Sequence, residues 1–289
     1  MTTLAPSPTV RGDRLITDEE FRLIRELVYE KTGISLSNAK RSLVQCRLAK
    51  RLRALSLKDY RDYYRLLVSK EETSGEMQTM INCITTNKTD FFRERHHFEF
   101  LSELVAERIA VSDRRPWRIW CAASSRGHEP YTIAMTLLDA LEGHSPVEIK
   151  ILATDIDTDV LAHAQRAVYT LDEVDELSYE QKRRYLLRGT GASEGVCRIK
   201  PEVRSLVTFR RFNLVHDQLK PSRPFDAIFL RNVLIYFDRE TQQKTLDSLR
   251  PALMPEGHLF LGHSENICWK DSGYIPLGAT VYQRTESRT

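Results

Sequence analysis

From Pro116 onward the sequence alternates short apolar runs with helical segments, and this alternation constrains the fold more than any other feature. The expected elements are strands at Trp117 to Ala122, Glu148 to Thr154, Phe225 to Leu230 and Leu259 to Gly262, with helices starting at Glu129, Thr158 and Arg239. Strands that alternate with helices in this way form a mostly parallel sheet covered by helices. We therefore predict a doubly wound α/β domain over residues 116–289.

Two segments of this domain break the alternation. The segment from Leu177 to Phe212 is rich in Arg, Gly and Val, and its turn at Arg188 to Gly191 precedes two short strand-like runs. We expect it to form a small antiparallel β insertion. Two strand-like runs between Gly273 and Gln283 are separated by Gly278, which favours a closing hairpin.

Residues 17–85 carry a helical pattern instead. Thr17 precedes three acidic residues and an apolar stripe at helical spacing, and Gly33 follows the stripe, so these two residues are the expected cap and stop of a first helix. Further helices are expected at residues 38–55, 60–68 and 76–84. We expect residues 1–16 to be a flexible tail and not a secretory signal. Residues 17–85 should form a small all-helical domain, and residues 86–115 a linker and connecting helix.

Composition limits the class of protein. Of the 289 residues, 41% are hydrophobic and 29% are charged, which is the balance of a water-soluble globular protein. No apolar run approaches the ~20 residues of a membrane-spanning helix. Five cysteines without a CxxC pair indicate reduced thiols, not disulfides or a zinc site. His96 and His97 lack a cysteine or carboxylate partner at ligand spacing, so no metal is expected. Ser264 lies in GHSE, which is not the GxSxG motif of hydrolases.

Polar residues follow two of the expected strands, where the carboxyl ends of parallel strands form a ligand-binding edge. The loop AASSRGHEPY, residues 122–131, has small residues that let the backbone approach a ligand closely. Asp155 follows the second strand and is placed to accept hydrogen bonds from both hydroxyls of a ribose. The alternative is that an acid here only caps the next helix, and Asp157 is the better candidate for that cap. These residues do not distinguish a nicotinamide dinucleotide from S-adenosylmethionine (SAM).

Four motifs are similar to those of one family. TTNKTDFFRE, residues 85–94, followed by His97 and Phe98, resembles the TTNxTxFFRe signature of the chemotaxis receptor methyltransferases, the CheR family. FDAIFLRNVLIYFD, residues 225–238, is similar to that family's FDxIfcRNvxIYFd. The loop at residues 122–131 resembles STGEEPYS, and GHSE at residues 262–265 matches a fourth element. The likeness extends, in order and spacing, from about Phe21 to Val281.

The resemblance implies a Rossmann-like, SAM-dependent protein-glutamate O-methyltransferase that forms glutamate methyl esters on chemotaxis receptors and releases S-adenosylhomocysteine (SAH). It implies that Arg93 lies near the reacting centre and that Tyr236 faces the transferable methyl group. The implied cofactor site consists of Asn87, Thr89, Arg93, Glu129, Asp155, Asn213, Leu214, Arg231 and Asn232. In that site Glu129 would hold the methionine amino group, Asp155 the ribose, and Asn213 with Leu214 the adenine region.

Methyl transfer from a sulfonium to a carboxylate needs no general base, because glutamate, with a pKa of about 4.3, is already ionised at neutral pH. Catalysis is then expected from alignment and charge compensation. Arg93 would pair with the incoming glutamate, while Tyr236 and nearby rings would line the sulfonium. The chain departs from the family at Arg126 and His128, where the family commonly has Thr and Glu. Cofactor binding is expected to persist, with the role of His128 left open.

A basic helix at residues 40–53 is the strongest partner signal. Arg47, Lys50, Arg51 and Arg53 crowd together in a helix that has no acidic residue, and like charges so placed repel one another. The alternative is a solvated helix face. The resemblance makes this face a docking surface for the acidic methylation helices of receptors. It also makes the insertion a place where, in some members, a receptor tail peptide adds a strand.

The expected protein is cytoplasmic, with no nucleic-acid partner and no inserted membrane segment. Two rival functions stay open. One is a methyltransferase of the same fold that acts on a small molecule or a nucleic acid. The other is a regulatory module that binds the cofactor or receptors without turnover, which the departures at Arg126 and His128 suggest. A methylation assay on receptor fragments distinguishes these functions.

Overall fold

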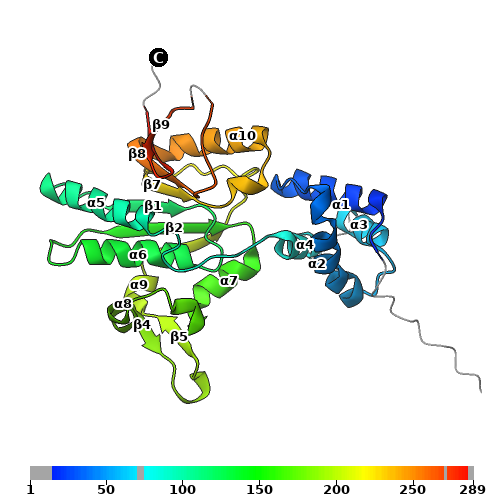
Figure 1. Cartoon of the computed structure of the whole chain (residues 1–289), viewed down its shortest axis with the longest axis horizontal. Helices are drawn as coiled ribbons and strands as arrows, with labels where there is room; N and C mark the ends of the chain where they lie inside the picture. The colour runs from blue at the N-terminus through cyan, green and yellow to red at the C-terminus, as the bar shows by residue number, and fades with distance from the viewer. Residues whose placement is uncertain (1–14, 70–74, 270–271, 286–289) are drawn as a thin grey trace, which may run out of the picture. The chain divides into compact units, whose positions relative to one another are not determined.

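The computed structural model describes residues 15–69, 75–269 and 272–285 of the chain. The chain divides into two compact units, with the boundary between Thr86 and Asn87 (Figure 1). Residues 1–14 of the expected tail lie outside the described residues, and Ile16, which was also assigned to the tail, is buried. None of the described helices is long and apolar enough to cross a membrane.

The first unit is built from helices. They are α1 (Asp18–Thr32), the 3-10 helix η1 (Asn38–Lys40), α2 (Arg41–Ala54), α3 (Tyr60–Val68) and α4 (Glu76–Ile84). Thr17 and Glu20 form a capping box at the start of α1, and Gly33 ends this helix in a left-handed conformation. The predicted cap and stop of the first helix are therefore confirmed.

A buried carboxylate joins three of these helices. Glu76, at the start of α4, is 4% exposed. It accepts hydrogen bonds from Arg51 of α2 (Nε 2.9 Å, Nη2 2.6 Å) and from the Tyr63 hydroxyl of α3 (2.7 Å). The hydrogen bond to Glu76 raises the pKa of Arg51, and burial together with the same carboxylate raises the pKa of Tyr63. Arg51 is therefore a structural residue of the helical unit.

The second unit contains a seven-stranded sheet with the order β6-β2-β1-β7-β8-β10-β9. Strands β6, β2, β1, β7 and β8 run parallel, and β10 is antiparallel to both of its neighbours. The strands are β1 (Trp117–Cys121), β2 (Ile149–Asp155), β6 (Val207–Arg211), β7 (Phe225–Leu230), β8 (Leu253–Leu261), β9 (Tyr274–Gly278) and β10 (Val281–Arg284). The predicted doubly wound α/β domain and its closing hairpin are confirmed.

The helices of the second unit are α5 (His96–Ala110), α6 (His128–Ala140), α7 (Thr158–Arg166), α8 (Tyr179–Tyr185), α9 (Pro201–Arg204) and α10 (Arg239–Leu249). Alternate residues of β1 point to opposite faces of the sheet. Ile119 joins the apolar core that contains Leu101 and Val105 of α5, whereas Trp120 packs against Phe225 outside that core. Residues 86–115 were predicted to form a linker and a connecting helix. The structure includes α5 in the second unit instead, because its apolar face completes this core.

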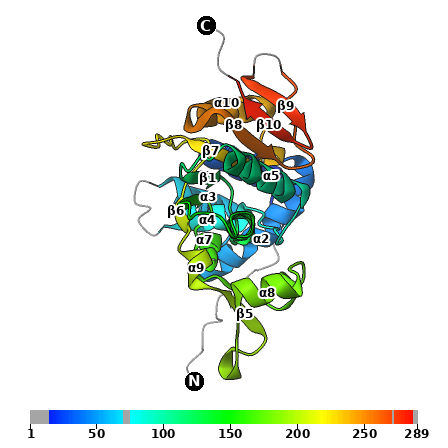
Figure 2. The same ribbon diagram turned by 90° about the vertical axis from the view of Figure 1, so that its left-hand side faces the viewer.

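The insertion also has different bounds from those expected. Its small antiparallel sheet has the order β3-β5-β4, from β3 (Val168–Thr170), β4 (Leu186–Arg188) and β5 (Val196–Ile199). It thus begins before Leu177, and β6, which falls inside the predicted range, belongs to the main sheet. As an edge strand with mixed polarity, β6 lacks the continuous apolar run of a central parallel strand. The small sheet and the β9–β10 hairpin lie at opposite ends of the second unit (Figure 1, Figure 2).

Removal of the Glu76 carboxylate should destabilise the helical unit. Glu76→Ala leaves the Arg51 guanidinium and the Tyr63 hydroxyl without their shared acceptor, so we expect the free energy of unfolding to fall by about 3 kcal/mol. Urea unfolding followed by circular dichroism measures this change. The control is Glu26→Ala, which removes an exposed ion pair with Arg22 on α1 and should cost under about 0.5 kcal/mol. Equal effects of the two substitutions would contradict the structural role of Glu76.

Candidate active site

The carboxyl ends of the parallel strands meet where the order of the chain reverses. From β1 the chain continues to β2 and β6 on one side and later to β7 and β8 on the other, so the reversal lies between β1 and β7. Ligands of open α/β sheets bind at this point. The segments that follow β1, β2 and β7 therefore define the candidate site.

Asp155 ends β2 with its carboxylate held by backbone donors. Its Oδ2 accepts from Ser125 N (2.8 Å) and its Oδ1 from Asp157 N (3.0 Å). Burial raises the pKa of Asp155 to about 6, against the effect of these hydrogen bonds. The N-cap of α7 is Asp157, as predicted, because its Oδ1 accepts from Asp159 N and Val160 N. Capping of α7 therefore does not explain Asp155.

The loop after β1 packs against Ala164 and Tyr169 at Gly127, the N-cap of α6. Gly127 has a φ of 94°, and a Cβ at this position would lie 2.8 Å from the Tyr169 hydroxyl and 2.9 Å from Ala164 Cβ. Glycine is therefore required for both conformation and space. The tight turn brings the first residues of α6, including Glu129, to the ends of the central strands.

The two departures from the family pattern have partners within this unit. Arg126 forms an ion pair with Glu173 (2.9 Å), and its Nη2 lies 3.3 Å from His163 Nε2. His128 is 2% exposed, and its ring centroid lies 4.7 Å from that of Phe91. Burial lowers the pKa of His128 to about 4. His128 is therefore a neutral core residue at neutral pH, while Arg126 ties the loop to the segment after β3.

Arg231 follows β7 and joins two carboxylates. Its side chain is 1% exposed, its Nη1 lies 2.6 Å from Glu129 Oε2, and its Nη2 lies 3.2 Å from Glu94 Oε2. The other oxygen of Glu129 lies 3.2 Å from the Cys121 thiol, whose pKa is raised by burial. A buried guanidinium is tolerated only where carboxylates compensate its charge. The ion pairs thus fix the first turn of α6 and residues 93–95 to the end of β7.

Asn87 begins the segment that reaches the same edge of the sheet. Its Nδ2 donates to Asp157 Oδ2 (2.7 Å), and its backbone oxygen accepts from Ser125 Oγ (3.1 Å). Asn87 is therefore held against the loops that follow β1 and β2. Thr89, two residues later, is half-buried.

Four of the ten described non-glycine residues with positive φ lie in the segments around the site. Phe92, Glu94, Ser125 and Asn232 have positive φ values of 52°, 56°, 46° and 58°. A left-handed conformation costs a residue other than glycine of order 1 kcal/mol or more and is commonly found at functional sites. Within this strained segment, Arg93 is half-buried and donates from Nη1 to Lys88 O (3.1 Å).

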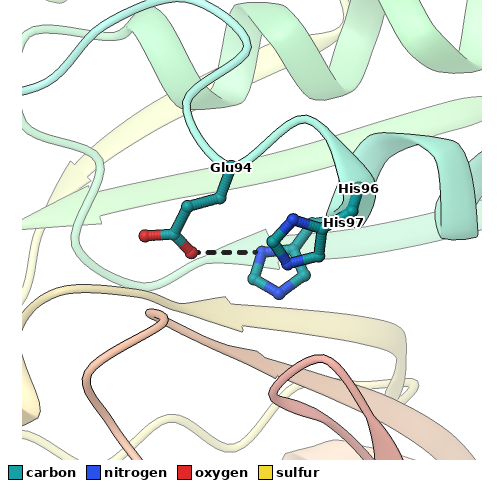
Figure 3. A group of neighbouring side chains, drawn as sticks. All are labelled: Glu94, His96 and His97. Carbon is teal, nitrogen blue, oxygen red and sulfur yellow. Dashed lines mark ion pairs between the residues drawn. The ribbon is translucent and has the colours of Figure 1, made fainter.

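Glu94, His96 and His97 bring three potential metal ligands within 4.8 Å of one another (Figure 3). The two histidines were expected to lack a carboxylate partner at ligand spacing, and Glu94 corrects this expectation. His97 Nε2 lies 2.9 Å from Ala279 O, so His97 donates there and its Nδ1 faces Glu94 Oε2 at 3.6 Å. Burial and the charge of Arg231 lower the pKa of His97 to about 4. A divalent cation would have to displace Arg231 from Glu94, so the geometry favours the ion pair.

Glu265 is a second carboxylate that sequence reasoning missed. It is 4% exposed and accepts from the backbone nitrogens of Gly262 (2.6 Å), Asn232 (2.8 Å) and Ile235 (3.3 Å). Burial raises the pKa of Glu265, although these hydrogen bonds oppose the change. The residue fixes the loop after β7 from inside the fold. The GHSE motif, residues 262–265, was the sequence feature that could have pointed to Glu265, but no role was predicted for this glutamate.

The other predicted residues lie on neighbouring segments of this unit. Tyr236 is half-buried at the end of η4 (Leu234–Tyr236), in the loop that begins with Arg231 and Asn232. Asn213 is buried after β6, and its side-chain oxygen accepts from Val215 N (3.0 Å). Leu214 is half-buried beside it. Because β6, β2, β1 and β7 are parallel neighbours, Asn213 and Asp155 lie at the same edge as Arg231.

The basic residues of α2, in the first unit, do not form one surface. Arg47 donates from Nη1 to Ile84 O (2.6 Å) and Thr85 O (2.9 Å), and Arg51 holds Glu76. The expectation that no nearby acid explains this cluster is wrong for Arg51, because the acid comes from α4 and not from its own helix.

Two of the four basic residues remain exposed. Lys50 and Arg53 lie three residues apart and share a stripe of α2 with the exposed Cys46. Among the described residues, neither Lys50 nor Arg53 forms an ion pair. The exposed charge of α2 is therefore smaller than predicted and is confined to this stripe.

Comparison with known proteins divides the chain at the boundary between the two units. The all-alpha domain of CheR methyltransferases matches residues 19–85, and the SAM-binding domain of CheR methyltransferases matches residues 87–282. The chain is 45% identical over 267 residues to the chemotaxis protein methyltransferase of Escherichia coli K12, which covers 92% of this chain and 91% of that protein. It is 44% identical over 283 residues to chemotaxis protein methyltransferase 2 of Pseudomonas aeruginosa, with 98% and 99% covered.

A more distant relative extends the same relationship. The chemotaxis protein methyltransferase of Borreliella burgdorferi is 36% identical over 260 residues, with 87% of this chain and 89% of that protein covered. Because the matches run through both units and cover nearly the whole chain, the protein belongs to the CheR methyltransferase family, whose members are SAM-dependent methyltransferases of chemotaxis.

Proposed function

We propose that this protein transfers the methyl group of SAM to glutamate side chains in the cytoplasmic part of chemotaxis receptors, forming glutamate methyl esters. The observation that carries the proposal is the charge balance at the ends of β1, β2 and β7. The carboxylates of Glu94, Glu129, Asp155 and Glu265 outnumber the guanidinium groups of Arg93 and Arg231 there. Excess negative charge in a partly buried site suits a cofactor whose sulfonium is positive.

The cofactor would extend along the strand ends. Asp155 would accept hydrogen bonds from the ribose hydroxyls, Glu129 would hold the methionine amino group, and Asn213 with Leu214 would border the adenine. The support for Glu129 is its ion pair with Arg231 after β7 and its contact with the Cys121 thiol at the end of β1. Each role uses a different strand end, as expected for a ligand that crosses the switch point of the sheet.

Further residues would enclose the cofactor. Arg231 and Asn232 would form the floor of the site, and Asn87 and Thr89 would cover it. The support for the cover is the hydrogen bond of Asn87 to Asp157, which joins its segment to the end of β2. Exclusion of water would strengthen the electrostatic interactions within the site.

Arg93 and Tyr236 would act on the reacting groups. Arg93 would pair with the ionised glutamate, which needs no general base because it attacks the methyl carbon as a carboxylate while SAH leaves with the electron pair of the broken bond. Tyr236 would line the sulfonium by cation–π attraction. Alignment of the two reactants would then supply most of the acceleration.

Two surfaces would serve receptor binding. Lys50 and Arg53 would attract the acidic receptor helices to α2. The edge strand β4 pairs only with β5 within the small sheet, so its other edge could accept an extended receptor tail peptide. A receptor partner would place the protein in the cytoplasm, where its five free thiols would stay reduced.

A direct assay tests the proposed function. The protein is incubated with methyl-labelled SAM and a receptor cytoplasmic fragment, and labelled methanol is measured after mild base treatment, which releases methyl esters. Base-labile label on the fragment is expected. SAM binding by calorimetry without label transfer would instead indicate a regulatory module, and label transferred only to a nucleic acid or small molecule would identify another methyltransferase.

Asp155→Ala should weaken SAH binding by about 1.5 to 3 kcal/mol, or roughly 10- to 150-fold, because hydrogen bonds from the ribose to a charged group are lost. Titration calorimetry measures the dissociation constant. Asp159→Ala, at an exposed position on α7, is the matched control and should bind as the wild type does.

The same carboxylate should make binding depend on pH. Only ionised Asp155 can accept from both hydroxyls, and its pKa in the free protein is about 6, so affinity should fall as the pH decreases through 6. Asp155→Asn should remove this step. A wild-type dissociation constant in Asp155→Ala would exclude the ribose role.

Arg93→Ala should lower kcat on a receptor fragment by about 100-fold while the dissociation constant of SAH changes much less, because the proposed partner of Arg93 is the reacting carboxylate. Steady-state kinetics and calorimetry measure the two effects. Arg95→Ala, at an exposed arginine of the same segment, is the control. Equal losses in kcat and affinity would reassign Arg93 to cofactor binding or to the fold.

Charge reversal at Lys50 and Arg53 together should raise KM for the receptor fragment and leave SAH affinity intact. Arg51 is left unchanged because it holds Glu76. Added salt should mimic the reversal, since exposed charges more than ~8 Å apart are screened at physiological ionic strength. The control reverses Lys150 and Lys244, which changes the net charge equally at exposed positions outside α2. Wild-type kinetics with an unchanged salt dependence would rule out this docking surface.

A further inference from the structure

The carboxylate of Glu94 contacts three segments of the second unit that meet at the proposed reacting centre. From its own segment, Arg93 Nε lies 3.9 Å from Oε1. From the end of β7, Arg231 Nη2 lies 3.2 Å from Oε2 and Asn232 Nδ2 lies 3.3 Å from Oε1. From the turn after β8, His263 Nδ1 lies 3.0 Å from Oε1. Glu94 has no individual role in the proposed reaction, although it lies beside Arg93, Arg231 and Asn232, which do.

Glu94 is held in its ionised form. Its side chain is 10% exposed, and burial alone would raise its pKa. The hydrogen bond from His263, the charge of Arg231 and the hydrogen bond from Asn232 outweigh burial and lower the pKa of Glu94 to about 2. Because an ionised carboxylate only accepts hydrogen bonds, His263 donates from Nδ1 and the Asn232 amide turns its nitrogen toward Glu94.

The loop that Glu94 contacts is fixed from its other side by Glu265. The backbone nitrogen of Asn232 donates to Glu265 Oε2 (2.8 Å), while its side-chain nitrogen faces Glu94. The Asn232 side chain packs directly on Gly262, where a Cβ would lie 2.3 Å from Asn232 Nδ2, so only glycine fits at this position. Removal of the Glu94 carboxylate would therefore release the side chain of Asn232 without releasing its backbone.

Glu94 also lies near Arg93, but it faces only the Nε atom of that guanidinium. Nη1 of Arg93 donates to Lys88 O (3.1 Å), and Nε is the atom turned toward Glu94. In the part of the chain that the structure describes, Nη2 of Arg93 has no hydrogen-bond acceptor. Glu94 and Lys88 thus orient the guanidinium with a donor left for an incoming carboxylate.

We propose that Glu94 is a positioning residue for methyl transfer, whose carboxylate aligns Arg93 with the Arg231–Asn232 loop so that the incoming glutamate meets the methyl group in line with the sulfonium. This inference rests on the proposed function. Glu94 acts through Arg93 and Asn232 and does not itself contact the substrate. Misplacement of a reacting group by about 1 Å can cost on the order of 100-fold in rate. The effect of Glu94 should therefore be on kcat.

The substitution Glu94→Gln tests this role because it keeps the size of the side chain and removes its charge. On a receptor fragment we expect kcat to fall by about 10- to 100-fold, while the dissociation constant of SAH stays close to that of the wild type. The thermal unfolding midpoint should fall, because Arg231 keeps only one of its two compensating carboxylates. Glu94→Asp, which retains the charge, should recover part of kcat. In an Arg93→Ala background, Glu94→Gln should lower kcat by a smaller factor than in the wild type, because only its effect through Asn232 is left. Glu103→Gln, at an exposed position on α5, is the control.

Two results would overturn the inference and leave the proposed function standing. The first is a Glu94→Gln enzyme with wild-type kcat. The second is a loss of kcat and of SAH affinity by the same factor that Glu94→Asp does not relieve, since this pattern indicates a purely structural residue. A wild-type protein that leaves the fragment unmethylated would contradict the proposed function itself, and the inference with it, before any variant is measured.

Discussion

The candidate site depends on the ion pairs of the buried Arg231 guanidinium. A positive charge that is 1% exposed is stable only if nearby carboxylates compensate it, and Glu129 and Glu94 do so from two directions. Glu129 belongs to α6, while Glu94 belongs to the segment before α5. One side chain thus fixes the loop after β7, the start of α6 and the FFRE segment to one another. Loss of either carboxylate would leave a buried charge partly uncompensated.

A similar arrangement organises the helical unit for a different purpose. Glu76 is nearly as buried as Arg231 and binds Arg51 and Tyr63 from two other helices. In the helical unit the buried pair joins helices, whereas the ion pairs of Arg231 join the loops of the candidate site. Burial therefore separates the charges of α2 into two kinds: Arg51 serves the fold, whereas Lys50 and Arg53 remain exposed.

Local elements of the fold were predictable because their signals are local. The bounds of α3, α4 and β7 agree with the expected ranges, since apolar periodicity and caps determine where such elements begin and end. The edge strand β6 was assigned to the insertion because its apolar run is interrupted. The role of α5 in the core was missed because it depends on packing. The resemblance supplied the proposed site residues. It could not supply the pairing of Arg231 with Glu94, or of Arg51 with Glu76, because both join residues far apart in the sequence.

The central claim is that the carboxylates of Asp155 and Glu129, at the strand ends, hold SAM beside Arg231. A crystal structure of the protein with SAH tests this most directly. The account predicts that the ribose hydroxyls lie within hydrogen-bond distance of Asp155, that the amino group of the methionine part lies beside Glu129, and that the sulfur lies near Arg93 and Tyr236. A cofactor bound elsewhere, or a ribose without contact to Asp155, would contradict it.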